Sequence, residues 1–210
     1  MNLFNTLNQS NYVFYFLVVD NFLDIQLPQL NNFHLIYAFN NPHLNSLAAK
    51  KIPYFCLETT GTVLPQKNTG RLLSSPKVID YIKSTSHHKT PVIIPFKPSA
   101  KIEILCRQHG WICAAVSHQL NRFLEDKNEF FHFCQTHNLP IIDGIVDKFN
   151  QSNFKKYQQK FGPKLVIQTH FGWAGNSTHL GKNWHDLANI IPPQTMVKFS
   201  PLLSGYSLIN

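Results

Sequence analysis

The sequence predicts an α/β fold. Short runs of β-branched and aromatic residues alternate with stretches of helical length and polarity. The chain has 210 residues, 43% of them hydrophobic, which is enough to bury one large core or two smaller ones. The alternation gives way near residue 118 to a polar stretch, His118 to Asn121. We therefore expect a domain boundary there, with one domain over 1–118 and another over 119–210.

The first part of the chain contains five strand candidates and three helix candidates. Strands are expected at 12–19, 34–39, 52–57, 91–96 and 112–117, and helices at about 42–50, 75–85 and 99–109. Pro76 after two serines is a good helix start. Ser99 is expected to cap the third helix, and Gly110 to end it.

The second part begins with a predicted helix from Glu125-Asp126 to about His137. The two acidic residues suit the positive end of the helix dipole. The spacing predicts that one face packs inward, made of Phe130, Phe133, Cys134 and His137.

An extended link, Leu139 to Gly144, is followed by a further helix and a strand. Ser152 is expected to cap the helix and Gly162-Pro163 to end it. Its inward residues are predicted to be Phe154, Tyr157 and Phe161, with Lys155, Lys156 and Lys160 facing water.

The stretch LVIQTHFGWAGNSTHLG, residues 165 to 181, is an apolar strand that stops in a loop of small residues. Such loops free backbone N–H groups that can hold a phosphate. The two glycines, Gly172 and Gly175, can equally shape a hairpin or a bulge at a sheet edge. The loop alone does not decide between these interpretations.

The formal charge is +8, but the basic residues are dispersed. All nineteen lie from Lys50 onward, and only Lys50-Lys51 and Lys155-Lys156 are adjacent pairs. A dense basic tract that follows a nucleic-acid backbone is missing, so we expect an anionic small molecule and no nucleic-acid partner.

Several other classes of protein are not indicated. The apolar run 12–19 is far shorter than the roughly 20 residues that a membrane span needs, so we expect no membrane partner and a cytoplasmic location. The four cysteines form no C-x-x-C pair and are expected to be reduced core residues. The sequence has no G-x-G-x-x-G fingerprint, no histidine or cysteine set for zinc and no G-x-S-x-G nucleophile motif.

Four segments follow one another after residue 112, with the small-residue loop between the last two: N-R-F-L-E-D-K-N-E-F-F, N-L-P-I-I-D-G, K-Y-Q-Q-K-F-G-P-K-L-V-I-Q and V-K-F-S-P-L-L-S-G-Y-S. Their order resembles the front part of the ATP-grasp superfamily. The resemblance implies a Rossmann-like pre-ATP-grasp domain over 1–118 and an incomplete ATP-grasp domain of the α+β type, with its lid subdomain, over 119–210.

The resemblance also implies an ATP site. Lys127 falls where these enzymes place a lysine against the nucleotide phosphates, although a surface helix lysine is the simpler interpretation. Gln168 falls where most of the family has a second phosphate-binding lysine, so an amide hydrogen bond would replace a charge there. Lys198 stands near a position that is often acidic in the family.

The loop and the strand after it would complete this ATP site. Its glycines would permit left-handed turns that aim amides at the β- and γ-phosphates, and its polar side chains would add donors. The lid would move over the triphosphate and consists of Gly172, Trp173, Ala174, Gly175, Asn176, Ser177 and Thr178. Residues 196–203 would form the hinge strand, with Leu202 or Leu203 against the adenine face.

ATP-grasp chemistry further requires Mg²⁺, held by carboxylates and an Asn beyond the hinge strand. This chain has no acidic side chain after Asp186. We therefore expect the magnesium ligands and the catalytic residues in a C-terminal segment outside these residues, and we predict none within them.

Two functions remain open. The chain is either the ATP-binding portion of a ligase, which would activate a carboxylate as an acyl phosphate for attack by an amine or thiol, or a non-catalytic binding or scaffold protein on the same fold. The motif order favours the ligase. The missing metal ligands and the departure at Gln168 favour the scaffold.

Overall fold

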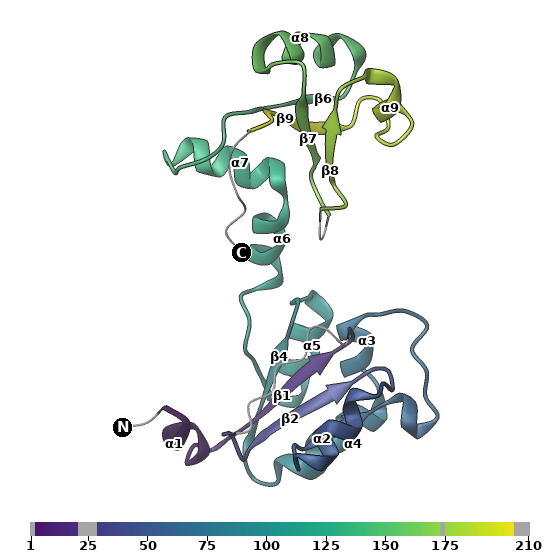
Figure 1. Cartoon of the computed structure of the whole chain (residues 1–210). Helices are drawn as coiled ribbons and strands as arrows, with labels where there is room; N and C mark the ends of the chain where they lie inside the picture. The colour runs from purple at the N-terminus through teal and green to yellow at the C-terminus, as the bar shows by residue number, and fades with distance from the viewer. Residues whose placement is uncertain (1–2, 21–28, 173–174, 204–210) are drawn as a thin grey trace. The chain divides into compact units, whose positions relative to one another are not determined.

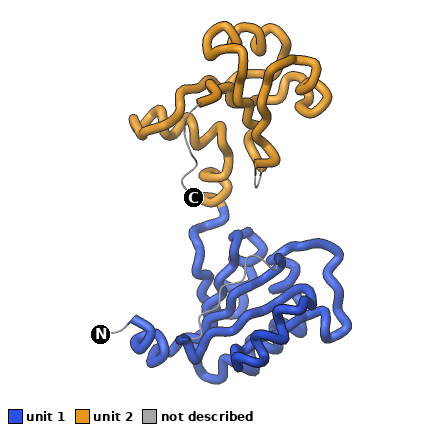
Figure 2. Tube along the Cα trace, viewed as in Figure 1, with its two compact units in different colours: residues 1–118 blue, residues 119–210 orange. Residues whose placement is uncertain are grey.

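The computed structural model describes residues 3–20, 29–172 and 175–203. The chain divides into two compact units, residues 1–118 and residues 119–210 (Figure 2). The first contains a parallel sheet with a hydrophobic core on each face, and the second contains an antiparallel sheet with a core of its own. The predicted α/β class is confirmed.

The sheet of the first unit has five strands in the order β3-β2-β1-β4-β5, all parallel (Figure 1). Its central strand is buried on both faces: Tyr15 and Leu17 enter one core, and Phe16 and Val18 enter the other. This explains the continuous apolar run in the sequence. The strands are β1 (Tyr12–Val18), β2 (Phe33–Tyr37), β3 (Tyr54–Cys56), β4 (Thr90–Pro95) and β5 (Ile112–Cys113).

Helices cover both faces of this sheet. One core includes α1 (Leu3–Asn8) and α2 (His43–Ala49), while the other includes α3 (Thr69–Leu73), α4 (Pro76–Ser86) and α5 (Ala100–His109); a 3-10 turn, η2 (Glu58–Thr60), follows β3. Ser99 accepts the N–H of Ile102 at 3.4 Å, and Gly110 ends α5 with a φ of 69°. The predicted start and end of this helix are confirmed.

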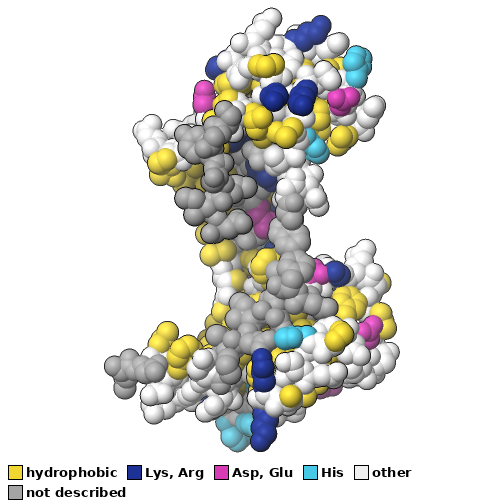
Figure 3. All heavy atoms as spheres, in the orientation of Figure 1, with side chains coloured by type: hydrophobic (Ala, Val, Ile, Leu, Met, Phe, Trp, Pro, Cys, Tyr) yellow, Lys and Arg dark blue, Asp and Glu magenta, His cyan; other side chains and the backbone are white. Residues whose placement is uncertain are grey.

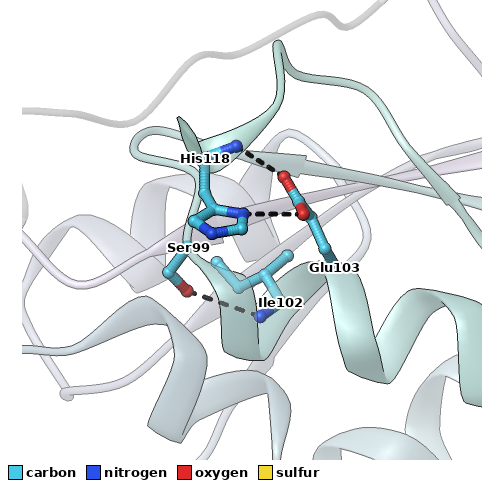
Figure 4. A network of polar contacts seen from close by, with 4 residues as sticks. All are labelled: Ser99, Ile102, Glu103 and His118. Carbon is cyan, nitrogen blue, oxygen red and sulfur yellow. Dashed lines mark hydrogen bonds and ion pairs between the residues drawn. The ribbon is translucent and has the colours of Figure 1, made fainter. Parts of the chain in front are cut away.

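Glu103 on α5 fixes the last residue of the first unit. Its carboxylate accepts the backbone N–H of His118 at 2.5 Å and lies 2.8 Å from Nδ1 of the His118 ring (Figure 4). Both bonds lower the pKa of Glu103. The polar stretch from His118 to Asn121, where we expected the domain boundary, is helical. It opens helix α6 (His118–Glu125), whose first N–H is satisfied by a carboxylate from another element.

The second unit contains a four-stranded antiparallel sheet in the order β6-β9-β7-β8. One face of this sheet packs against α8 and α9. Its side chains in that core include Leu165, Ile167 and Phe199. In the view of Figure 1, α8 lies above these strands and α7 below them. The elements are α7 (Lys127–Thr136), β6 (Ile145–Lys148), α8 (Gln151–Phe161), β7 (Leu165–Thr169), β8 (Thr178–Gly181), α9 (Trp184–Ala188) and β9 (Met196–Pro201).

The predicted inward face of α7 is correct for Cys134 and wrong for the other three residues. Phe131 and Cys134 are buried, whereas Phe130 and Phe133 are 40% and 37% exposed. His137 is exposed and lies against the Phe133 ring, with 4.4 Å between the centroids. The aromatic residues fit two helical faces, and the contact of α7 with β9 selects the face that carries Phe131.

The cap of α8 also differs from the prediction. Asn150, not Ser152, accepts the N–H of Asn153, at 2.8 Å, because the helix begins two residues earlier than expected. Phe154 and Tyr157 are buried as predicted, while Phe161 is half-buried.

The surface carries few charges. On the face that Figure 3 shows, basic side chains stand singly or in small groups among uncharged and hydrophobic ones. The four cysteines are free, as predicted, and Cys113 is the half-buried one. No helix among the described residues is long and apolar enough to cross a membrane.

Candidate functional site

One face of the sheet in the second unit carries a row of polar side chains. Gln168 on β7 lies opposite Lys198 on β9 and opposite Thr178 on β8. Residues directly opposite each other in an antiparallel pair point to the same face. This row, Lys198–Gln168–Thr178, therefore lies on the face away from α8 and α9, and three of the predicted site residues meet there.

Gln168 is half-buried and is held within the sheet. Its Nε2 donates to Oγ1 of Thr178 at 3.1 Å. The amide thus fixes the hairpin between β7 and β8, and its nitrogen has less freedom to reach another partner.

Lys198 is half-buried beside α7. Its Nζ lies 4.9 Å from the centroid of the buried Phe131 ring, a cation–π contact. Burial lowers the pKa of Lys198. A Cβ added to Gly144 would lie 3.1 Å from Cε of Lys198 and 2.9 Å from the carbonyl oxygen of Phe199. The link before β6 therefore packs closely against the lysine stem.

Lys127 joins the start of α7 to the start of the predicted lid loop. Its backbone N–H donates to the carbonyl oxygen of His170 at 2.9 Å, and its Nζ donates to that of Gly172 at 3.3 Å. Asp126 caps the helix by accepting two backbone N–H groups of α7. The positive end of a helix dipole and an ammonium group therefore lie where β7 ends.

The loop closes a β-hairpin between β7 and β8. Gly175 has a φ of 82°, the left-handed conformation that glycine favours, and its carbonyl oxygen accepts the N–H of Thr178 at 2.9 Å. Gly172 is not left-handed, contrary to the prediction. A glycine is needed at position 172 for another reason: a Cβ there would overlap the side chain of Ser177.

The polar residues of the loop are not equivalent. Asn176 is exposed, but Ser177 is 4% exposed, and its Oγ has no hydrogen-bond partner in the described part of the chain. We expected Ser177 to be an exposed hydrogen-bond donor. Its burial prevents this in the present conformation. Trp173 and Ala174 lie outside the described residues. Leu202 and Leu203, just past β9, are 39% and 48% exposed.

Sequence reasoning missed three neighbours of the site. The Nδ2 of Asn128, which is buried, donates to the carbonyl oxygen of Met196 at 3.2 Å. The ring of Phe131 contacts the ammonium group of Lys198. Gly144 has no side chain, which lets the link before β6 pass close to Lys198 and Phe199. The three-residue spacing of Asn128, Phe131 and Cys134 was the available signal, obscured by the neighbouring aromatic residues.

The described residues contain no group of three or more His, Cys, Asp or Glu side chains that could hold a metal ion. The described residues therefore do not fit a Mg²⁺ site.

Neither a protein-family model nor a curated protein sequence matches this chain. Its structure is similar to N5-carboxyaminoimidazole synthetase from Staphylococcus aureus complexed with ADP, with a TM-score of 0.53 and 12% identity over 91% of this chain and 47% of that one. An ADP complex of N5-carboxyaminoimidazole ribonucleotide synthetase gives a TM-score of 0.52 at 9% identity over 91% and 47%.

A third similar structure is the biotin carboxylase domain of 2-oxoglutarate carboxylase from Hydrogenobacter thermophilus, in complex with MgADP, ADP and bicarbonate. Its TM-score is 0.50, at 12% identity over 90% of this chain and 44% of that one. The chain thus has an ATP-grasp-like fold. It spans about half the length of these solved structures.

Proposed function

We propose that the second unit binds ATP on the sheet face that carries the row Lys198–Gln168–Thr178. One observation supports this most: Lys127 comes from a separate part of the sequence and donates to Gly172 at the start of the hairpin loop, and this hairpin carries two members of the polar row. Ammonium groups beside a polar row of this kind suit a polyphosphate.

The proposed roles follow from the chemistry of each group. Lys127 neutralises phosphate charge, and Gln168 adds an amide. The loop from Gly172 to Thr178 covers the β- and γ-phosphates, and Leu202 and Leu203 pack against the adenine. Together these groups position the γ-phosphate and stabilise charge, which is most of what a protein contributes to phosphoryl transfer.

ATP titration of the 210-residue chain by calorimetry tests the proposal. Lys127→Met is expected to weaken binding about tenfold or more, the effect of one lost charge-assisted hydrogen bond. Lys155→Met, on the exposed face of α8, is the matched control and is expected to bind like wild type. A wild-type chain without measurable ATP affinity contradicts the proposal.

We further propose that ATP bound here serves a ligase, in which a carboxylate is activated as an acyl phosphate and attacked by an amine or thiol. The second candidate is a non-catalytic scaffold, favoured by the lack of a metal-binding cluster in the described part of the chain. ADP release by a form extended beyond Asn210 separates the two. Release that requires both a carboxylate and an amine or thiol supports the ligase, and ATP binding without release supports the scaffold.

A further inference from the structure

Lys198 is a half-buried ammonium without a carboxylate partner among the described residues. It contacts the face of Phe131, and the pKa of the lysine is lowered because burial disfavours its charged form. A charge that is removed from water and left without an ion pair costs stability. A methionine or leucine would pack on Phe131 without that cost, so the ammonium is the feature that needs an explanation.

The place of Lys198 in the sheet indicates what the charge is for. It lies directly opposite Gln168, on the same face. Neighbouring strands are about 4.8 Å apart, and a lysine side chain is long enough to bring its Nζ over the adjacent strand. Gln168 carries no charge, and its amide nitrogen already donates to Thr178. Within the row, Lys198 on β9 is therefore the residue that can supply a cation to an anion on this face.

We propose that Lys198 is the cation that holds the phosphate chain of the nucleotide on this face, from the strand next to the one that carries Gln168. This inference rests on the proposed function and names the residue and the ligand group within that site. The ligand class is a di- or triphosphate. Its oxygens would pair with Nζ of Lys198 and with Oγ1 of Thr178, with the Phe131 ring still supporting the lysine stem.

Three variants of the full chain test this role. Lys198→Gln removes the charge, and the double variant Gln168→Lys/Lys198→Gln moves it across to β7. Lys160→Gln is the matched control, because Nζ of Lys160 also lies over an aromatic ring, that of Phe161 at 5.0 Å, but on α8. Lys198→Met, which keeps an apolar stem against Phe131, replaces Lys198→Gln if the latter does not fold. The probes are inorganic tripolyphosphate and ATP, titrated by calorimetry at low and high salt.

We expect Lys198→Gln to bind both probes about ten- to a hundredfold more weakly, with a smaller salt dependence. The double variant should recover most of this loss, and Lys160→Gln should bind like wild type. A merely structural role for Lys198 predicts a lower Tm instead, whereas relief of an unpaired charge predicts a Tm that is equal or higher.

The outcomes separate this inference from the proposed function. If wild type binds ATP and Lys198→Gln binds it equally well, the role of Lys198 is overturned and ATP binding stands. If tripolyphosphate binds through Lys198 and the affinity for ATP is no higher than that for tripolyphosphate, Lys198 forms an anion site. The proposal that this face recognises a nucleotide is then overturned. If wild type binds neither probe, both are overturned.

Discussion

Replacement of Gly172 by alanine should open the hairpin between β7 and β8. A Cβ at this position would overlap both Cβ and Oγ of Ser177 and would lie 3.0 Å from its backbone nitrogen. Ser177 is 4% exposed and has little room to turn away. Overpacking of this kind lowers the free energy of unfolding by about 1–3 kcal/mol. Each kcal/mol lowers the Tm of a domain as small as the second unit, residues 119–210, by about 4–8 °C.

The assay is thermal unfolding of Gly172→Ala, with two companion variants that isolate the cause. A Cβ added at Gly175 meets no atom of the described residues within 4 Å, so Gly175→Ala should cost only the strain of its φ of 82°, about 1 kcal/mol. Ser177→Gly in the Gly172→Ala background removes the overlapping atoms and should restore most of the lost stability. The reasoning is refuted if Gly172→Ala is as stable as wild type, or if Ser177→Gly does not rescue it.

Three further predictions concern single groups. Asp126→Ala should lower the free energy of unfolding by about 1 kcal/mol, because α7 loses the cap of two backbone N–H groups, and Asp126→Asn should recover most of it in urea unfolding. Burial lowers the pKa of His34 from 6.5 to about 4, so the unfolded chain takes up a proton first. Stability should therefore fall as the pH drops from about 6.5 to 4, and His34→Gln should flatten this part of the pH profile in an acid-unfolding series; an unchanged slope would contradict the assignment. The hydroxyl of Tyr157 donates to Asp147 at 2.6 Å and lowers the pKa of that carboxyl. Tyr157→Phe should raise the pKa of Asp147, as followed by NMR titration, and an unshifted carboxyl would show that the bond is absent in solution.

The architecture of the first unit was predictable because its signals are local. Strands of a parallel sheet that is covered on both faces are continuous apolar runs, and β1 is one. Ser99 and Gly110 bound α5 by the ordinary chemistry of helix caps. The ATP-grasp-like fold was predictable from the order of several weak motifs along the chain. The local chemistry of any one motif would not have revealed that fold.

The details of the site were less predictable because they depend on contacts between distant segments. The inward face of α7 is selected by β9, with Asn128 bonded to Met196 and Phe131 below Lys198. The pairing of Gln168 with Lys198 needs the register of two strands, which no local pattern states. The need for glycine at 172 likewise arises from Ser177 across the hairpin.

The central claim is that the second unit binds ATP on one face of its sheet. Amide hydrogen exchange of the whole chain with and without ATP tests it most directly, because the method locates the binding surface. We expect ATP to slow exchange at the start of α7, along the hairpin of β7 and β8 and in β9, and to leave the first unit unchanged. Unaltered exchange in these three elements at saturating ATP, or protection confined to the first unit, would contradict the account.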